Sequence, residues 1–134
     1  RDGGVIIAVG ECADGVGGDG FFCTFRDCTD VTELLRQFRE TPPEETVTDQ
    51  WQSHIFARIL EKHTVILVSG VEEETVRALH MLPAKTVEEA VEQAISMTGL
   101  KHCDITVIPE GISTIVLKED QKEREDLPGK EMTL

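Results

Sequence analysis

Short apolar runs and amphipathic stretches follow one another along this chain. A continuous apolar run covers residues 5–9, and a second run, with the apolar residues 65–68 at its centre, covers 64–70; β-branched residues dominate both. The run at 5–9 predicts a strand buried on both faces, and the run at 64–70 is the clearest strand signal in the chain. Two further strands are predicted at 104–109 and, shorter, at 114–117.

Helical periodicity fills the intervals between these runs. Asp30 is the expected N-cap of a helix whose residues Val31, Leu34, Leu35 and Phe38 share one apolar face. Further helices are predicted at 44–62, from 72 to about 80, and from a cap at Thr86 to a stop at Gly99. Residues 21–25 fit a short helix or a turn.

Strands separated by helices are typical of the α/β class. We expect a small, open, mostly parallel sheet with helices on both faces, a Rossmann-like arrangement of three layers. Residues 1–117 form the expected domain, and its abrupt start suggests a piece of a longer chain. The charged segment 118–134 is expected to be a flexible tail.

Composition and charge exclude several functional classes. The 134 residues are 40% hydrophobic and carry a formal net charge of -13, with no cluster of Lys and Arg. Nucleic-acid binding and attraction to an acidic membrane surface are therefore disfavoured. No apolar run reaches the roughly 18 residues of a membrane span. The four cysteines match no common zinc spacing, and we interpret them as free, mostly buried thiols of a cytoplasmic protein.

The most informative segment is the loop 10–20, in which five of eleven residues are glycine. It follows a predicted strand, at the sheet edge where open α/β sheets place ligands. Gly15, Gly17 and Gly20 satisfy the spacing GxGxxG, but the fingerprint needs its first glycine directly after the strand. Asp14 and Asp19 would also repel a pyrophosphate. A functional loop and a plain glycine turn both stay open on the residues alone.

Trp51 is the only tryptophan. A lone Trp on a helix is usually part of the core, but the polar neighbours of Trp51 favour a half-exposed position lining a cleft. None of the four histidines shows a metal-binding spacing, so no metal ligand is assigned. His63 and His80 lie near helix C-termini, which is a structural position, and only His54, close to Trp51, is a candidate for a site.

Three blocks of this sequence resemble the C-terminal domain of the nickel-dependent lactate racemases. The first is the run from Gly3 to Gly17, and the second is Asp49-Gln50-Trp51-Gln52, followed by Arg58 and the strand at 65–69. The third is the run from Pro83 to Ala90, followed by Val107 to Gly111. Their order and spacing cover about residues 3 to 111.

The resemblance implies a two-domain enzyme with a cleft between its α/β domains. In that family the N-terminal domain carries a nickel-pincer nucleotide tethered to a lysine. Its metal-bound pyridinium ring takes a hydride from the α-carbon of a 2-hydroxy acid and returns it to either face. The C-terminal domain closes over the cleft and helps to hold the substrate. The cofactor-bearing domain and the substrate-facing Tyr-Gln-x-x-Lys segment that usually precedes the first strand are both missing from this chain.

The resemblance therefore implies a closing domain that binds no cofactor and has no activity by itself, with no catalytic residue in this chain. Its partners would be the N-terminal domain of the same protein and a small 2-hydroxy acid. The residues expected to face substrate or cofactor are Trp51, Gln52, Glu11, Asp14, Gly15 and Gly17. The alternative from the residues alone is an acidic binding or regulatory module whose loop holds a cation through Glu11, Asp14 and Asp19. A separate dinucleotide-binding oxidoreductase domain is a distant third.

Overall fold

A computed structural model describes residues 3–48, 50–99 and 103–115 of the chain. These residues belong to two compact units, Arg1–Cys103 and Asp104–Leu134, which we describe separately. The predicted tail 118–134 lies outside the described residues, so the predicted domain boundary stays a prediction.

The first unit is an α/β fold around a three-stranded parallel sheet. Its strands are β1 (Val5–Val9), β2 (Thr64–Val68) and β3 (Leu82–Ala84), in the order β1-β2-β3. β2 pairs with both neighbours, and Val9 of β1 lies opposite Val68 of β2. The predicted class, a small open parallel sheet, is confirmed.

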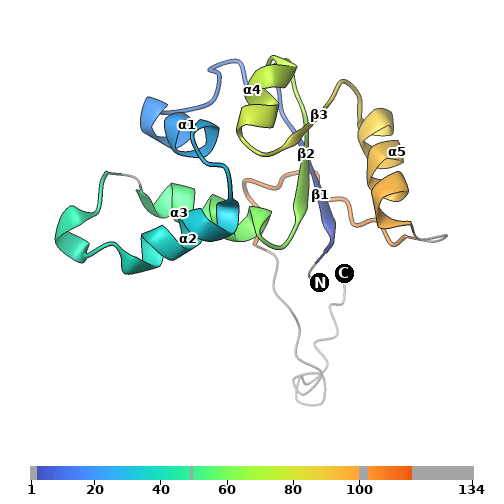
Figure 1. Cartoon of the computed structure of the whole chain (residues 1–134). Helices are drawn as coiled ribbons and strands as arrows, with labels where there is room; N and C mark the ends of the chain where they lie inside the picture. The colour runs from blue at the N-terminus through green and yellow to red at the C-terminus, as the bar shows by residue number, and fades with distance from the viewer. Residues whose placement is uncertain (1–2, 49, 100–102, 116–134) are drawn as a thin grey trace, which may run out of the picture. The chain divides into compact units, whose positions relative to one another are not determined.

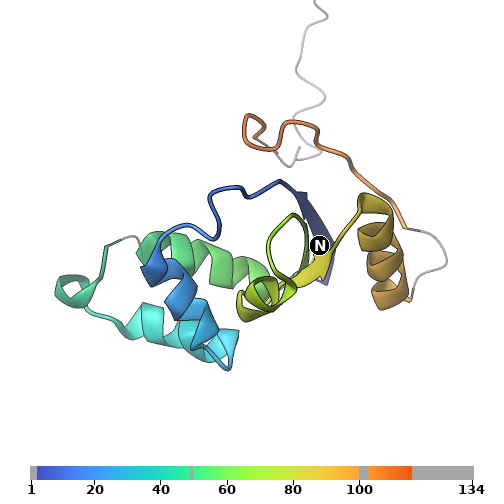
Figure 2. The same ribbon diagram turned by 90° about the horizontal axis from the view of Figure 1, so that it is seen from above.

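Helices cover both faces of this sheet (Figures 1 and 2). On one side lie α1 (Asp19–Arg26), α2 (Val31–Glu40), α3 (Gln50–Leu60) and α4 (Glu73–Ala78), with a short 3₁₀ turn at Pro43–Glu45. α5 (Val87–Thr98) is the described helix of this unit that lies on the other side, where it packs against all three strands. The three-layer arrangement follows from this division of the helices.

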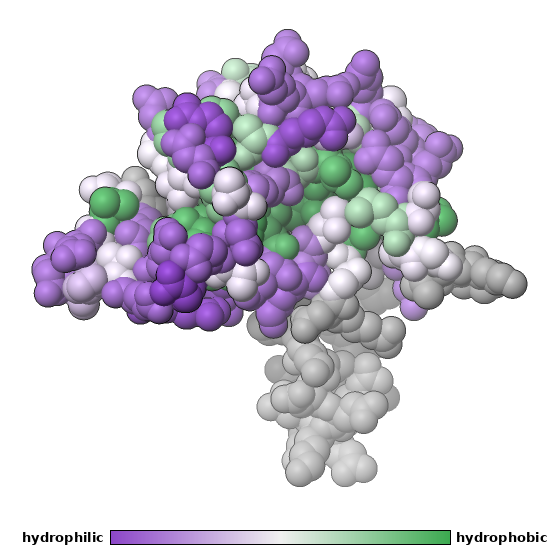
Figure 3. Space-filling view, viewed as in Figure 1, coloured by the Kyte–Doolittle hydropathy of each residue, from purple (hydrophilic) through white to green (hydrophobic). Residues whose placement is uncertain are grey.

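Two apolar clusters hold the layers together. Phe25, Leu34, Leu35, Ala57 and Leu79 join the helices on the first side, with Phe21 and Phe56 packed against them. Ile66, Val68, Ala84 and Ala90 join the sheet to α5. In the space-filling view, polar residues cover most of the helical side, and apolar residues are visible in the middle of the molecule (Figure 3). Burial of these apolar side chains is the main force that stabilises the unit.

Local caps explain where several helices begin and end. The Asp30 carboxylate accepts a hydrogen bond from the Thr32 N–H at 2.8 Å, and the Thr86 hydroxyl accepts one from the Glu89 N–H at 3.1 Å. Gly99 ends α5 in the left-handed conformation with φ 61°. These three positions agree with the sequence prediction.

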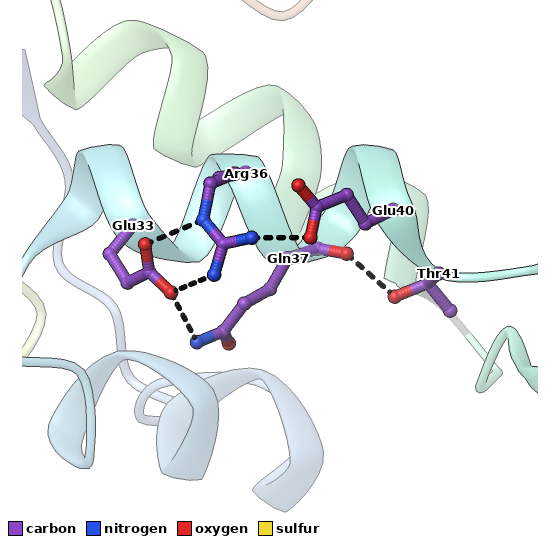
Figure 4. A network of polar contacts seen from close by, with 5 residues as sticks. All are labelled: Glu33, Arg36, Gln37, Glu40 and Thr41. Atoms are coloured by element: carbon purple, nitrogen blue, oxygen red, sulfur yellow. Dashed lines mark hydrogen bonds and ion pairs between the residues drawn. The ribbon is translucent and has the colours of Figure 1, made fainter.

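The exposed side of α2 carries a polar network (Figure 4). The Arg36 guanidinium donates to Glu33 at 2.8 and 2.6 Å and also contacts Glu40 one turn later. Gln37 donates to Glu33 at 3.2 Å. The Glu33 carboxylate is thus bonded to the following turn of its own helix.

Three predictions about the elements of this unit need correction. β1 was expected to be buried on both faces, but it is an edge strand in which Ile6 is 41% and Val9 65% exposed. The helix predicted at 44–62 begins only at Gln50, because β-branched residues at 46–48 favour extended backbone over helix. The short strand β3 was not predicted.

In the second unit, the described residues 104–115 contain no strand, so the prediction of a strand at 104–109 was wrong. Ile105 is 63% and Val107 78% exposed, and no strand in the part of the chain that the structure describes pairs with them. A turn lies at 109–113, where the Ser113 N–H donates to the Glu110 carbonyl at 3.0 Å. Of the short strand predicted at 114–117, residues 114 and 115 are not in a strand, and the other two lie outside the described residues.

Within the described part of the chain, no helix has both the length and the apolar character needed to cross a membrane.

Candidate functional site

Loops from all three strands meet at one edge of the sheet, because the carboxyl ends of parallel strands point the same way. The Gly10 N–H donates to the Val68 carbonyl at 3.1 Å, so the glycine-rich loop leaves the sheet beside the end of β2. A Cβ added at Gly70 would lie 3.7 Å from the Glu11 carbonyl oxygen. The loops after β1 and β2 therefore run in close contact at this edge.

The glycine-rich loop adopts backbone conformations that favour glycine. Gly15 and Gly17 have φ angles of 80° and 84°, in the left-handed region. The Gly15 N–H donates to the Cys12 carbonyl at 2.9 Å, which closes a turn. Glu11 and Asp14 are exposed, as are both glycines. The loop thus presents two carboxylates and exposed main chain to the surroundings.

Val16 attaches this loop to the helical core. It is partly buried and packs against the cluster that contains Phe25 and Ala57. Ala57 belongs to α3, so the end of the loop and the middle of α3 rest on the same core.

Trp51 and Gln52 lie in the first turn of α3, and both are exposed. Trp51 is 62% exposed, while Ser53 and Ala57 are the buried residues of this helix. The indole is therefore not a core side chain. The expected site residues form two groups, one on the loop after β1 and one on α3, and their common role at a cleft stays a prediction.

A hollow of about 330 Å³ lies between α4 and α5, at the ends of β2 and β3. Ser69, Gly70, Lys85 and Gln93 are among its lining residues, and none of the six predicted site residues is. The sequence prediction missed this hollow. Ser69 and Lys85 directly follow the ends of β2 and β3, where parallel sheets place ligands, but because β3 was not predicted, no signal in the sequence brings the two residues together.

A second hollow, of about 510 Å³, lies between α1 and α2 and is lined by Cys23, Cys28, Asp27 and Glu33, among others. Burial raises the pKa of the Cys28 thiol above its ordinary value, which keeps the thiol protonated near neutral pH. A protonated thiol is a poor nucleophile, so this hollow has no activated cysteine at position 28. All four cysteines are free, but none is fully buried, because Cys12 is exposed and the other three are half-buried, so the expectation of mostly buried thiols was wrong.

The described histidines lie among packing and backbone contacts. His54 packs edge-on against Phe38, with 5.9 Å between ring centroids. The His80 imidazole contacts two backbone carbonyls at the end of α1. His63 precedes β2, and its Nδ1 is buried and has no hydrogen-bond partner among the described residues. His102 lies outside the described residues. Within the described ranges, no three His, Cys, Asp or Glu side chains are arranged to hold a metal ion.

Comparison with known proteins identifies the family. Residues 1–116 match the family described as lactate racemase C-terminal domain. The chain belongs to this family. A lactate racemase of Lactiplantibacillus plantarum is 44% identical to it over 117 residues, which are 87% of this chain and 27% of the relative. A lactate racemase of Thermoanaerobacterium thermosaccharolyticum is 42% identical over 117 residues, which are again 87% of this chain and 27% of the relative.

A solved structure supports the same fold. The lactate racemase apoprotein from Thermoanaerobacterium thermosaccharolyticum superimposes with a TM-score of 0.69 and 42% identity. The match covers 72% of this chain and 24% of that structure. The chain thus corresponds to the C-terminal domain and spans about a quarter of the length of these lactate racemases.

Proposed function

We propose that this chain is the closing domain of a 2-hydroxy acid racemase or epimerase that uses a nickel-pincer nucleotide. The observation that carries the proposal is the family match over residues 1–116, together with the quarter of each relative that the chain spans. The relatives are lactate racemases, and lactate is therefore the first substrate to test.

The cofactor would be held by the N-terminal domain of the same protein. Since the described residues provide no metal-ligating set, we assign no nickel ligand to this chain. When bound, the nickel-pincer nucleotide supplies the acceptor and donor of the hydride. The chain's own contribution would be shape, exclusion of water and hydrogen bonds over the substrate.

Trp51 is the residue that we propose as an apolar wall of the cleft, with Gln52 beside it as an amide donor and acceptor. The indole is exposed in this domain, and this exposure supports the role. A large apolar side chain at the surface is typical of a site that a ligand or a partner covers. The exposed loop residues Glu11, Asp14, Gly15 and Gly17 would form the rim of the same cleft.

Activity assays on two forms of the protein test this proposal. The purified chain should not interconvert D- and L-lactate, even when cofactor is added, because the domain that holds the cofactor is absent. The full-length protein carrying the cofactor should interconvert them, or another pair of 2-hydroxy acid stereoisomers. Turnover by the isolated chain would contradict the proposed division of labour.

The cation-binding alternative finds no support in the geometry. Glu11, Asp14 and Asp19 are not gathered into a metal-binding group among the described residues. Calorimetric titration of the chain with Ca²⁺ or Mg²⁺ distinguishes the two functions. Tight binding that Asp14→Asn abolishes would favour the alternative.

A further inference from the structure

The helices change from one side of the sheet to the other between β2 and β3. After β2 the chain enters α4, on the side of α1, α2 and α3, and after β3 it enters α5 on the opposite side (Figures 1 and 2). β2 and β3 are paired parallel neighbours, so the two loops leave adjacent strand ends in opposite directions. Open α/β sheets bind ligands in the crevice that such a reversal creates. The crevice is formed by β2, β3, α4 and α5, which all belong to the first unit.

The hollow of about 330 Å³ lies at this reversal, and its lining combines apolar and charged side chains. Val76 is 1% and Ala84 5% exposed, and Leu67 and Pro83 are half-buried. The charged residues of the lining are all exposed, and they are Glu72, Glu73, Arg77, Lys85 and Glu89. The hollow thus has an apolar floor and a rim with charges of both signs.

Two of the rim charges have no partner. Among the described residues, neither the Lys85 ammonium nor the Glu72 carboxylate forms a hydrogen bond or an ion pair. In contrast, Glu73 pairs with Arg77 at 3.5 Å, and Glu89 accepts from the Lys85 main-chain N–H at 2.8 Å. Glu72 lies on the loop after β2 and Lys85 on the loop after β3, so the unpaired anion and cation come from the two loops that form the crevice. A ligand that carries both a cation and an anion can bridge them.

We propose that this hollow binds a small zwitterion, namely an α-amino acid with an apolar side chain. A purely anionic ligand would meet three carboxylates at the rim, and a purely cationic ligand would meet Arg77 and Lys85. A neutral ligand would remove water from the two unpaired charges without replacing it, which is costly. An amino acid presents its carboxylate to Lys85, its ammonium to Glu72 and its side chain to the apolar floor.

Isothermal titration calorimetry of the full-length protein with L-leucine tests this site. We expect saturable binding of one L-leucine per chain. Two probes of similar shape each lack one charge, since isocaproate has no ammonium group and isoamylamine has no carboxylate. Each should bind about tenfold more weakly than L-leucine, because one charged group of the rim is left unpaired. No saturation at millimolar L-leucine, or equal binding of all three compounds, would overturn the proposal.

Two substitutions connect the binding to the hollow. Lys85→Gln should weaken L-leucine binding about tenfold and leave isoamylamine binding unchanged, because that probe has no carboxylate. Glu72→Gln should weaken L-leucine binding to a similar extent and leave isocaproate binding unchanged. Arg39→Gln is the matched control, since Arg39 is an exposed cation of α2 outside the lining.

Urea denaturation of the variants checks that they keep the stability of the wild type, as expected for exposed side chains. Binding of L-leucine that neither Lys85→Gln nor Glu72→Gln weakens would overturn the proposal. Equal weakening by Arg39→Gln would do the same, because it would assign the effect to net charge. The proposal goes beyond the proposed function, and the titrations need neither cofactor nor turnover. A protein without racemase activity that binds L-leucine in this way would count against the proposed function alone.

Discussion

The His80 imidazole Nε2 lies 3.0 Å from the carbonyl oxygen of Phe25, although 55 residues separate the two in sequence. The same nitrogen lies 3.0 Å from the Cys28 carbonyl. A carbonyl oxygen only accepts hydrogen bonds, so Nε2 is the nitrogen that carries the hydrogen. His80 thus satisfies backbone acceptors at the C-terminal end of α1 and ties α1 to the turn after α4.

Replacing His80 should destabilise the first unit. His80→Ala removes the donor from two carbonyls and should lower the free energy of unfolding by about 1–3 kcal/mol, as measured by urea denaturation. His80 has φ 59°, which costs a residue with a Cβ about 1–2 kcal/mol. His80→Gly loses the donor but relieves that strain, and it should be less destabilising than His80→Ala. Equal stability of both variants and the wild type would mean that the contact to α1 contributes nothing.

The Glu33 carboxylate predicts a pH dependence of stability. Hydrogen bonds from Arg36 and Gln37 lower its pKa from the ordinary value of 4.5 to about 2. A carboxyl whose folded pKa is depressed contributes stability that is present above its unfolded pKa and is lost as the pH falls through its folded pKa. The contribution of Glu33 should therefore disappear between about pH 4.5 and pH 2.

Thermal unfolding across that pH range, at low and high salt, measures this effect. Glu33→Gln should unfold at a lower temperature than the wild type at pH 7 and should lose less stability on acidification. Because the pair is exposed, salt should reduce the difference. Arg36→Gln removes the charge of the other residue in the pair. It should change the dependence of stability on pH in a similar way. A pH profile that Glu33→Gln leaves unchanged would contradict the assignment.

The glycine-rich loop offers a matched pair of substitutions. A Cβ at Gly17 or Gly20 would meet nothing within 4 Å, so neither substitution by alanine is limited by space. Gly17 has φ 84°, whereas Gly20 lies inside α1. Gly17→Ala should therefore destabilise the chain by about 1–2 kcal/mol through backbone strain. Gly20→Ala should stabilise it by about 0.5–1 kcal/mol through helix propensity. Urea denaturation of both variants checks the difference, and the same sign for both would refute the backbone explanation.

Local chemistry predicts some of these elements, and packing decides the others. The side-chain caps at Asp30 and Thr86 and the stop at Gly99 depend on residues within one helical turn, so the sequence pattern was sufficient. β3 was missed because it has only three residues and contains a proline, and its strand conformation depends on pairing with β2. The run at 104–109 has the composition of a strand but no neighbour to pair with among the described residues.

The candidate site shows the same limit. The polar neighbours of Trp51 indicated that the indole is outside the core, and it is 62% exposed. The hollow lined by Ser69, Lys85 and Gln93 combines the ends of two strands with one side of α5. No short segment contains that combination. The packing of α5 on the sheet creates this hollow. The pattern of apolar residues predicts which side of α5 faces the sheet, but it does not predict the distance between α5 and the strand ends.

Trp51 allows the most direct test of the proposed cleft. In the full-length enzyme loaded with cofactor, Trp51→Ala should lower kcat/KM for lactate by about tenfold or more, which is a loss of about 1.4 kcal/mol of transition-state stabilisation. The free energy of unfolding should change by no more than about 0.5 kcal/mol, because the indole is exposed and contributes little to the core. Val47→Ala is the control, since Val47 is 66% exposed and precedes α3 without belonging to the predicted site. Both steady-state kinetics and denaturation are needed, since a folding defect would lower activity and stability together. A Trp51→Ala enzyme with the kinetics of the wild type would show that the indole does not touch the substrate or the cofactor, and the proposed wall would then have to be sought on the loop after β1.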